Sequence, residues 1–144
     1  MSVEAAIYEA WSAYRPLSDL VPVESVWKGR LPQKGEDDVA LAKPYVSLLA
    51  EDPEATRTSS NLFTMANLQL RVYAETEAEA ERIVNEAKDY LDGLSGNWSR
   101  GRVLDCKWNG TTREDDEDDG SWNLVATFAV QVEEARRPAL LRHG

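Results

Sequence analysis

The segment Asn67–Gly93, "NLQLRVYAETEAEAERIVNEAKDYLDG", decides the fold, because it joins a strand pattern directly to a helix pattern. Over residues 67–74 apolar and polar side chains alternate, which is typical of a strand with one buried face. Over residues 76–92 the apolar positions recur every three or four residues, which predicts an amphipathic helix. Thr76 and Glu79 form a T-x-x-E capping box at its start, and the final glycine supplies a left-handed stop.

Working outward, the same reasoning predicts further elements on the N-terminal side. A helix is expected over residues 3–15, where apolar positions again follow helical spacing and a proline comes next. A short strand is expected near residues 24–29, and another begins at Tyr45. Residues 30–44 and 52–61 are rich in proline and polar residues, so we expect both segments to be loops.

The last structured unit is predicted to be a hairpin. Its first arm, 104–108, and its second arm, 122–132, both alternate, and the connection "NGTTREDDEDDG" lies between them. Leu104, Cys106 and Trp108 are expected to share the face that points at the helices. So are the even-numbered residues of the second arm and of the strand at 68–74.

These elements predict an α+β fold, a mostly antiparallel sheet of four to five strands with two main helices packed on one face. We expect residues 1–134 to form one domain and residues 135–144 to form a basic, flexible tail. The length of 144 residues fits a single domain of this kind.

The formal net charge of −10 disfavours a nucleic-acid backbone or an anionic membrane as the main partner, because both would repel the surface. The start, "MSVEAAIYEAW", lacks the basic and apolar regions of a secretory signal. No apolar run is long enough for a membrane span. The composition therefore predicts an intracellular, acidic protein.

Residues suited to catalysis are scarce. His143 is the only histidine and Cys106 the only cysteine, which argues against a Ser/His/Asp triad, a Cys–His pair and a Cys- or His-based metal site. Cys106 lies on an apolar face, so we expect a core residue. Trp11, Trp108 and Trp122 also fall on apolar faces, while Trp27 and Trp98 are candidates for a partner surface. We therefore expect no enzyme activity, no cofactor and no metal.

The acidic run Glu114–Asp119 leaves three interpretations open. Its spacing matches the first positions of a calcium loop, but Ala126 stands where that loop needs a glutamate and the flanks alternate as strands. The run can instead be a solvated tip that opposes aggregation. It can also be an interaction surface that meets the arginines of the C-terminal segment in a neighbouring subunit. The candidate residues for a subunit interface or a ring lumen are Glu114, Asp115, Asp116, Glu117, Asp118, Asp119, Arg136, Arg137 and Arg142.

The order of elements resembles the small tail-completion or tail-terminator proteins of long-tailed bacteriophages and prophages. The resemblance is carried by Leu31-Pro32-Gln33, by Pro44-Tyr45-Val46 and above all by the run from Gln69 to Gly93, and it covers roughly residues 4–133. It implies a structural role. A ring of about six subunits would cap the growing tail tube and offer a surface to the head or its connector, using head-to-tail contacts.

This resemblance implies as partners other copies of the chain, the tail-tube protein and a head-completion or connector protein. It implies no membrane and no sequence-specific nucleic acid. The expected location is the host cytoplasm during assembly and then the virion tail. In the ring, the acidic run would meet a neighbouring subunit or line the lumen, where it would repel DNA.

Two features depart from the family pattern. The acidic connection is longer and more charged than is usual, and the tail beyond Glu134 has no counterpart. A second function, from a different class, is a monomeric acidic adaptor without catalytic activity that binds a basic partner through the acidic run.

Overall fold

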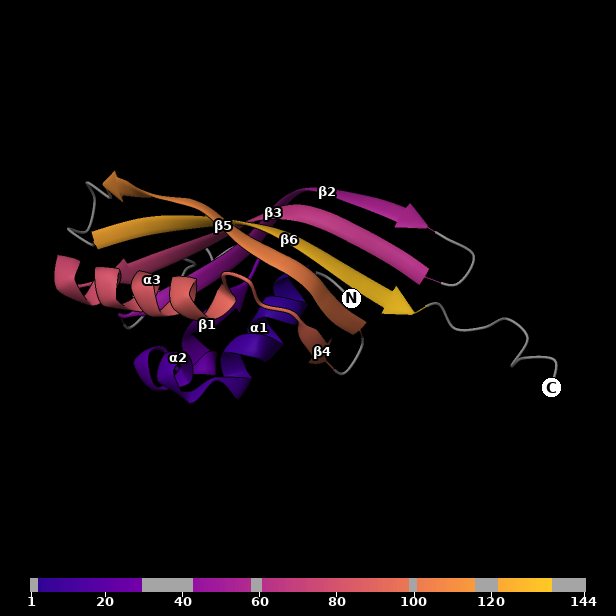
Figure 1. Cartoon of the computed structure of the whole chain (residues 1–144). Coiled ribbons are helices and arrows are strands. Elements are labelled where there is room, and N and C mark those ends of the chain that lie inside the picture. Colours follow the sequence, from indigo (N-terminus) through magenta and orange to yellow (C-terminus); the bar gives the residue numbers. More distant parts are fainter. Residues whose placement is uncertain (1–2, 30–42, 58–60, 99–100, 116–121, 136–144) are drawn as a thin grey trace, which may run out of the picture.

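Six strands form one curled sheet in the computed structural model of the protein, in the order β1-β2-β3-β6-β5-β4 (Figure 1). The structure describes residues 3–29, 43–57, 61–98, 101–115 and 122–135. Neighbouring strands are antiparallel except β1 and β2, which are parallel. The helical elements are α1 (Val3–Ala13), α2 (Arg15–Leu20), η1 (Val23–Ser25) and α3 (Glu77–Leu91). The strands are β1 (Val26–Lys28), β2 (Tyr45–Arg57), β3 (Asn61–Ala74), β4 (Gly96–Trp98), β5 (Gly101–Asp115) and β6 (Trp122–Ala135).

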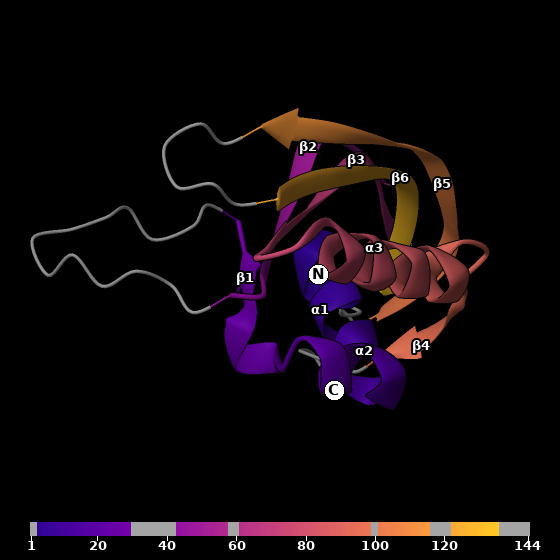
Figure 2. The same cartoon turned by 90° about the vertical axis from the view of Figure 1, so that its left-hand side faces the viewer.

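The sheet curls over α1, and α3 lies beside that helix on the same side of the sheet (Figure 2). We call this covered side the inner face and the opposite side the outer face. The core between helices and sheet contains apolar side chains from every layer, including Ile7 and Trp11 of α1, Ile83 of α3 and Phe128 of β6. Trp11 is fully buried, and its indole Nε1 donates a hydrogen bond to the carbonyl of Val21 at 3.0 Å. The predicted α+β class, with its helices on one face, is confirmed.

The deciding segment folds as predicted, with one change in the cap of α3. The amide of Glu79 donates to Thr76 Oγ1 at 3.2 Å, which is the first half of the capping box. The carboxylate of Glu79 accepts from the amide of Glu75, one residue earlier than the box requires. Gly93 follows the helix with a φ of +83°, as expected of the glycine that ends it.

Three predictions about the strands and helices are wrong. Among the described residues the sheet has six strands, not four to five. Residues 52–57 and residue 61 belong to β2 and β3, not to a loop, and a register shift between Glu51 and Glu54 accommodates Pro53, which has no amide to donate. The predicted helix at 3–15 ends at Ala13, and α2 begins two residues later with a proline in its first turn.

The hairpin is also longer and less regular than predicted. Most of the expected connection belongs to β5, which extends to Asp115. A register shift between Val103 and Asp105 gives β5 an extra residue at Leu104, so Val103 is the buried residue there. Beyond the shift, Cys106 and Trp108 face the core as expected.

Candidate functional site

The metal-ligand and thiol chemistry weighed from the sequence can be checked in the part of the chain that the structure describes. Within it, no cluster of three or more His, Cys, Asp or Glu side chains could hold a metal ion. Cys106 is fully buried, and burial, with smaller contributions from Asp105 and Asp92, raises the pKa of its thiol to about 12. The thiol is therefore protonated at neutral pH, and its predicted place in the core is confirmed. None of the described helices is long and apolar enough to cross a membrane.

The tryptophans divide as the sequence indicates, as far as the structure describes them. Trp11 is fully buried, and Trp108 and Trp122 are partly buried against the core. Lys88 lies 3.9 Å from the ring centre of Trp108, and Arg113 lies 3.8 Å from that of Trp122, both as cation–π contacts. The indole of Trp27 is partly exposed on β1, whereas the side chain of Trp98 lies outside the described residues.

The outer face of the sheet carries polar side chains in rows that cross four strands. One row consists of Tyr45, Tyr73, Asn123 and Glu114 on β2, β3, β6 and β5, in that order. The side chains of the four neighbours in such a row stand beside one another on the same face. Glu114, the first residue of the acidic run, thus lies at one end of a row that β3 and β6 also build.

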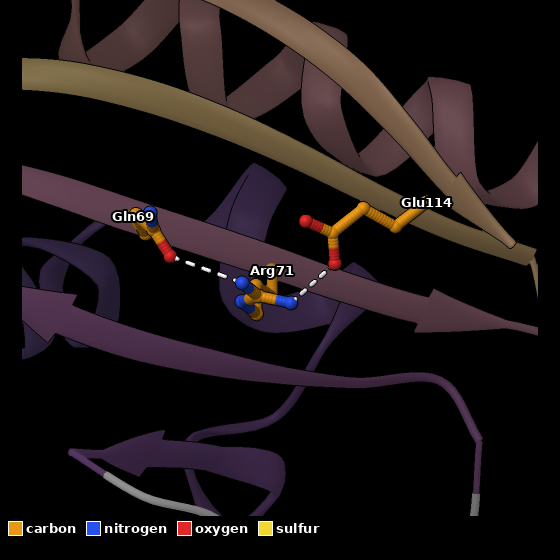
Figure 3. Close-up of polar contacts among 3 residues, drawn as sticks. All are labelled: Gln69, Arg71 and Glu114. Carbon is orange, nitrogen blue, oxygen red and sulfur yellow. Dashed lines mark hydrogen bonds and ion pairs between the residues drawn. The ribbon is translucent and has the colours of Figure 1, made fainter. Parts of the chain in front are cut away.

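An ion pair links this row to the next one. Arg71 donates from one terminal nitrogen to Glu114 Oε2 at 2.5 Å and from the other to Gln69 Oε1 at 3.2 Å (Figure 3). The bond to Glu114 crosses over β6, which lies between their strands. With side chains 28% and 48% exposed, the two ions remain partly hydrated, so this pair contributes little to stability.

Two polar residues on this outer face are buried although the helices lie on the other side of the sheet. Ser47 is 4% exposed and Asn123 is 6% exposed. The amide oxygen of Asn123, Oδ1, is closed off from solvent and accepts no hydrogen bond from the described residues. Leaving a buried acceptor unpaired costs on the order of 1–3 kcal/mol, so this oxygen is a local weakness of the isolated chain.

Aromatic and apolar side chains lie beside these polar groups. The rings of Tyr45 and Tyr73 stack with their centres 4.6 Å apart. Further along β3, Met65 is 54% exposed on the same face. Val125, between Arg71 and Thr112 in the next row, is almost fully buried. The outer face therefore combines a flat aromatic patch, an exposed methionine and charged groups.

The two edges of the sheet are only partly paired. β1 pairs with β2 along Val46–Leu48, and the amide of Gly29 adds a bond to Leu48. β4 pairs with β5 along 101–103, and the turn after α3 bonds to β5 as far as Trp108. Beyond these points, no described strand pairs with the backbone edge of β2 that faces away from β3, or with the edge of β5 that faces away from β6.

Of the predicted interface residues, the structure gives the surroundings of Glu114 alone. Asp115 ends β5, and nothing of its side chain is described. The others, Asp116, Glu117, Asp118, Asp119, Arg136, Arg137 and Arg142, lie outside the described residues, as does most of the 30–44 segment. Sequence reasoning missed Arg71, Tyr73 and Asn123 as neighbours of Glu114. The alternation of β3 and β6 puts these residues on the outer face, but only the register between strands brings them together.

Comparison with known proteins finds a similar fold among solved structures. No family model matches the chain, and no curated protein matches it. Among solved structures, a chain in the structure described as "Virion of native gene transfer agent (GTA) particle" has a TM-score of 0.70 and 23% sequence identity. The match covers 92% of this chain and 95% of that chain. The protein therefore has, over nearly its whole length, the fold of a chain found in a virion particle.

Proposed function

We propose that the protein is a structural component of a phage-like virion that ends or completes the tail by forming a ring and offers the surface to which the head joins. The observation that carries this proposal is the match in fold to a chain of a virion particle over nearly the whole of both chains. The resemblance of residues 4–133 to tail-terminator proteins points to the tail and to the ring. A role of this kind needs no catalytic residue, cofactor or metal.

The shape of the sheet supports assembly from identical subunits. A ring requires two different, complementary surfaces on each subunit. Two stretches lack an edge partner among the described residues, β2 from Leu49 to Arg57 and β5 after Trp108, and they lie on opposite edges of one sheet. β2 and β5 run antiparallel to each other, so the edge of one copy can extend the sheet of the next by antiparallel pairing.

The open stretches also lie toward opposite ends of the sheet. The unpaired part of each strand is its C-terminal part. Because β2 and β5 run in opposite directions, these two parts lie at opposite ends of the sheet. Copies paired along these stretches would be staggered along the strand direction, and stagger is what tilts strands when a sheet closes on itself. The remaining partners would be the tail-tube protein and a head-completion or connector protein, in the host cytoplasm during assembly and in the finished tail.

The test is the size of the assembled protein. Size-exclusion chromatography with light scattering at several concentrations, followed by negative-stain microscopy of any large species, should reveal a closed ring of about six subunits. If the purified chain is monomeric, the same measurement is repeated with tail-tube protein, which should carry a ring at its tip. A chain that stays monomeric under both conditions would contradict the proposal and favour the monomeric adaptor.

A further inference from the structure

The acidic corner is the group of three neighbouring outer-face residues Tyr73, Asn123 and Glu114. The side chain of Glu114 is half exposed, and its carboxylate accepts a bond from Arg71 through Oε2. No bond to the other carboxylate oxygen, Oε1, is found among the described residues. Asn123 adds the buried, unpaired Oδ1. Both oxygens are acceptors, and five more acids follow Glu114 in the sequence. The chemistry that satisfies such a corner is a cation with several N–H donors.

Two arginines that could supply this cation come directly after the last residue of β6, at the other end of the sheet. β6 runs from the acidic corner to Ala135, and Arg136 and Arg137 come next in the sequence. Arginine offers five donors in a planar fork, which suits a carboxylate, and its flat face stacks on an aromatic ring such as that of Tyr73. The chain thus carries an acidic and a basic group of complementary chemistry.

These two groups cannot meet within one subunit. Asn123 and Ala135 are twelve residues apart along β6, which corresponds to about 40 Å of strand. In Figure 1 the two ends of β6 lie at opposite ends of the sheet. The two residues from Ala135 to Arg137 span about 7 Å even when fully extended, and the arginine side chain adds about as much again. A contact between these arginines and the acidic corner must therefore join two copies of the chain.

We propose that the acidic corner binds a guanidinium group from the 136–144 segment of a second copy, through Arg136 or Arg137. This inference rests on the proposed function, because it takes a second copy of the chain as the partner. It adds the residues through which the two copies would contact each other. The guanidinium donates to Glu114 Oε1 and lies against Tyr73. Because solvent cannot reach Oδ1 of Asn123, a flanking side chain must rotate before a donor can bond it. The contact is head-to-tail, as ring closure requires.

The direct test measures binding of a labelled peptide to the full-length chain. The peptide has the sequence of residues 134–144, "EARRPALLRHG", and the receptor is the full-length R136E/R137E variant, whose own tail no longer competes. Fluorescence anisotropy at low salt should reveal binding, and high salt should weaken it. A peptide with both arginines replaced by glutamine should bind at least tenfold more weakly. Equal binding of the two peptides, or no binding of either, would overturn the proposal.

Two receptor variants locate the site. Glu114→Gln should weaken peptide binding about tenfold, because it replaces a carboxylate by a neutral amide of the same shape. Asn123→Leu should weaken binding as well, yet leave the free energy of unfolding unchanged or raise it, because it removes an unpaired buried oxygen. If either variant binds the peptide as well as its parent, that residue does not belong to the site.

Assembly separates this proposal from the proposed function. R136E/R137E should lower the apparent mass of the wild-type assembly, whereas the matched reversal R15E/R82E, at exposed arginines on α2 and α3, should not. If the tail variant still forms rings and the peptide does not bind, the contact is wrong while the ring stands. A wild-type chain that forms no ring, alone or on tail tubes, would end the proposed function whatever the peptide does.

Discussion

The two faces of strand β3 differ sharply, although they are built from alternate residues of the same segment. On the inner face, Leu68, Leu70 and Val72 are fully buried under the helices. On the outer face, Gln69, Arg71 and Tyr73 stay partly exposed. Burying apolar area is the main favourable term in folding, whereas partly hydrated ion pairs contribute little. The inner face therefore provides most of the stability of the fold, and the outer face contributes less to it.

The largest expected effect tests this division at adjacent positions of β6. Phe128→Ala, on the inner face, should lower the free energy of unfolding by about 3–5 kcal/mol, because it leaves a cavity in a closed core. The neighbouring outer-face change Thr127→Ala should cost about 0.5 kcal/mol or less. Urea titration of both variants measures the difference. Similar losses of unfolding free energy for the two variants would contradict this difference between the faces.

The next effect concerns Cys106, the titratable thiol of the inner face. Because folding raises its pKa from 9.0 to about 12, the native chain keeps a proton that the unfolded chain releases above pH 9. The associated stability is complete below pH 9 and is lost as the pH rises toward 12. At pH 10 the loss should be about 1.4 kcal/mol. The free energy of unfolding, measured from pH 8 to pH 10, should therefore fall faster for the wild type than for Cys106→Ala. Parallel curves for the two proteins would contradict the pKa shift.

A smaller effect is expected at the start of α3, the helix that covers the inner face. Thr76→Ala removes the side-chain oxygen that accepts from the amide of Glu79, and it should cost about 1 kcal/mol. Thr76→Ser keeps the acceptor and is the matched control, with almost no change. Thermal unfolding followed by circular dichroism distinguishes the two. Equal melting temperatures for both variants would mean that the cap does not stabilise the helix.

The smallest effect belongs to the outer face. In a double-mutant cycle, Arg71→Gln and Glu114→Gln should show a coupling energy of about 0.2–1 kcal/mol, and high salt should reduce it. Denaturant titration of the wild type, the two single variants and the double variant measures this coupling. A coupling of several kcal/mol would mean that the outer face contributes substantially to folding, as the inner face does.

The sequence was sufficient to predict the elements whose pattern is local. The strand and helix of the 67–93 segment and the core position of Cys106 follow from periodicity, and the structure agrees. The strand ends at 52–57 were missed, because Pro53 and polar residues resemble a loop until pairing with β3 stabilises them. The extra residue at Leu104 was missed too, because a β-bulge depends on pairing with the partner strand and has no hydrophobic pattern of its own in the sequence.

The candidate site was predictable only in part. Glu114 was singled out by charge, and the outward direction of Arg71 and Tyr73 follows from alternation. That these residues share a corner with Asn123 depends on the register of three strands, which a single sequence does not encode locally. The buried, unpaired oxygen of Asn123 has no sequence signal, because an asparagine in a strand is usually hydrated.

The position of α1 in the chain has a consequence for how the protein is made. This helix precedes all six described strands in the chain and packs against β2, β3 and β6, of which β6 is synthesised more than a hundred residues later. Contacts between such distant segments form slowly, because a long loop must close before they contribute. The core around Trp11 and Ile7 is therefore complete only after β6 has been made. In a pulse-proteolysis experiment on stalled nascent chains, protection of α1 should reach its full level only once β6 has emerged.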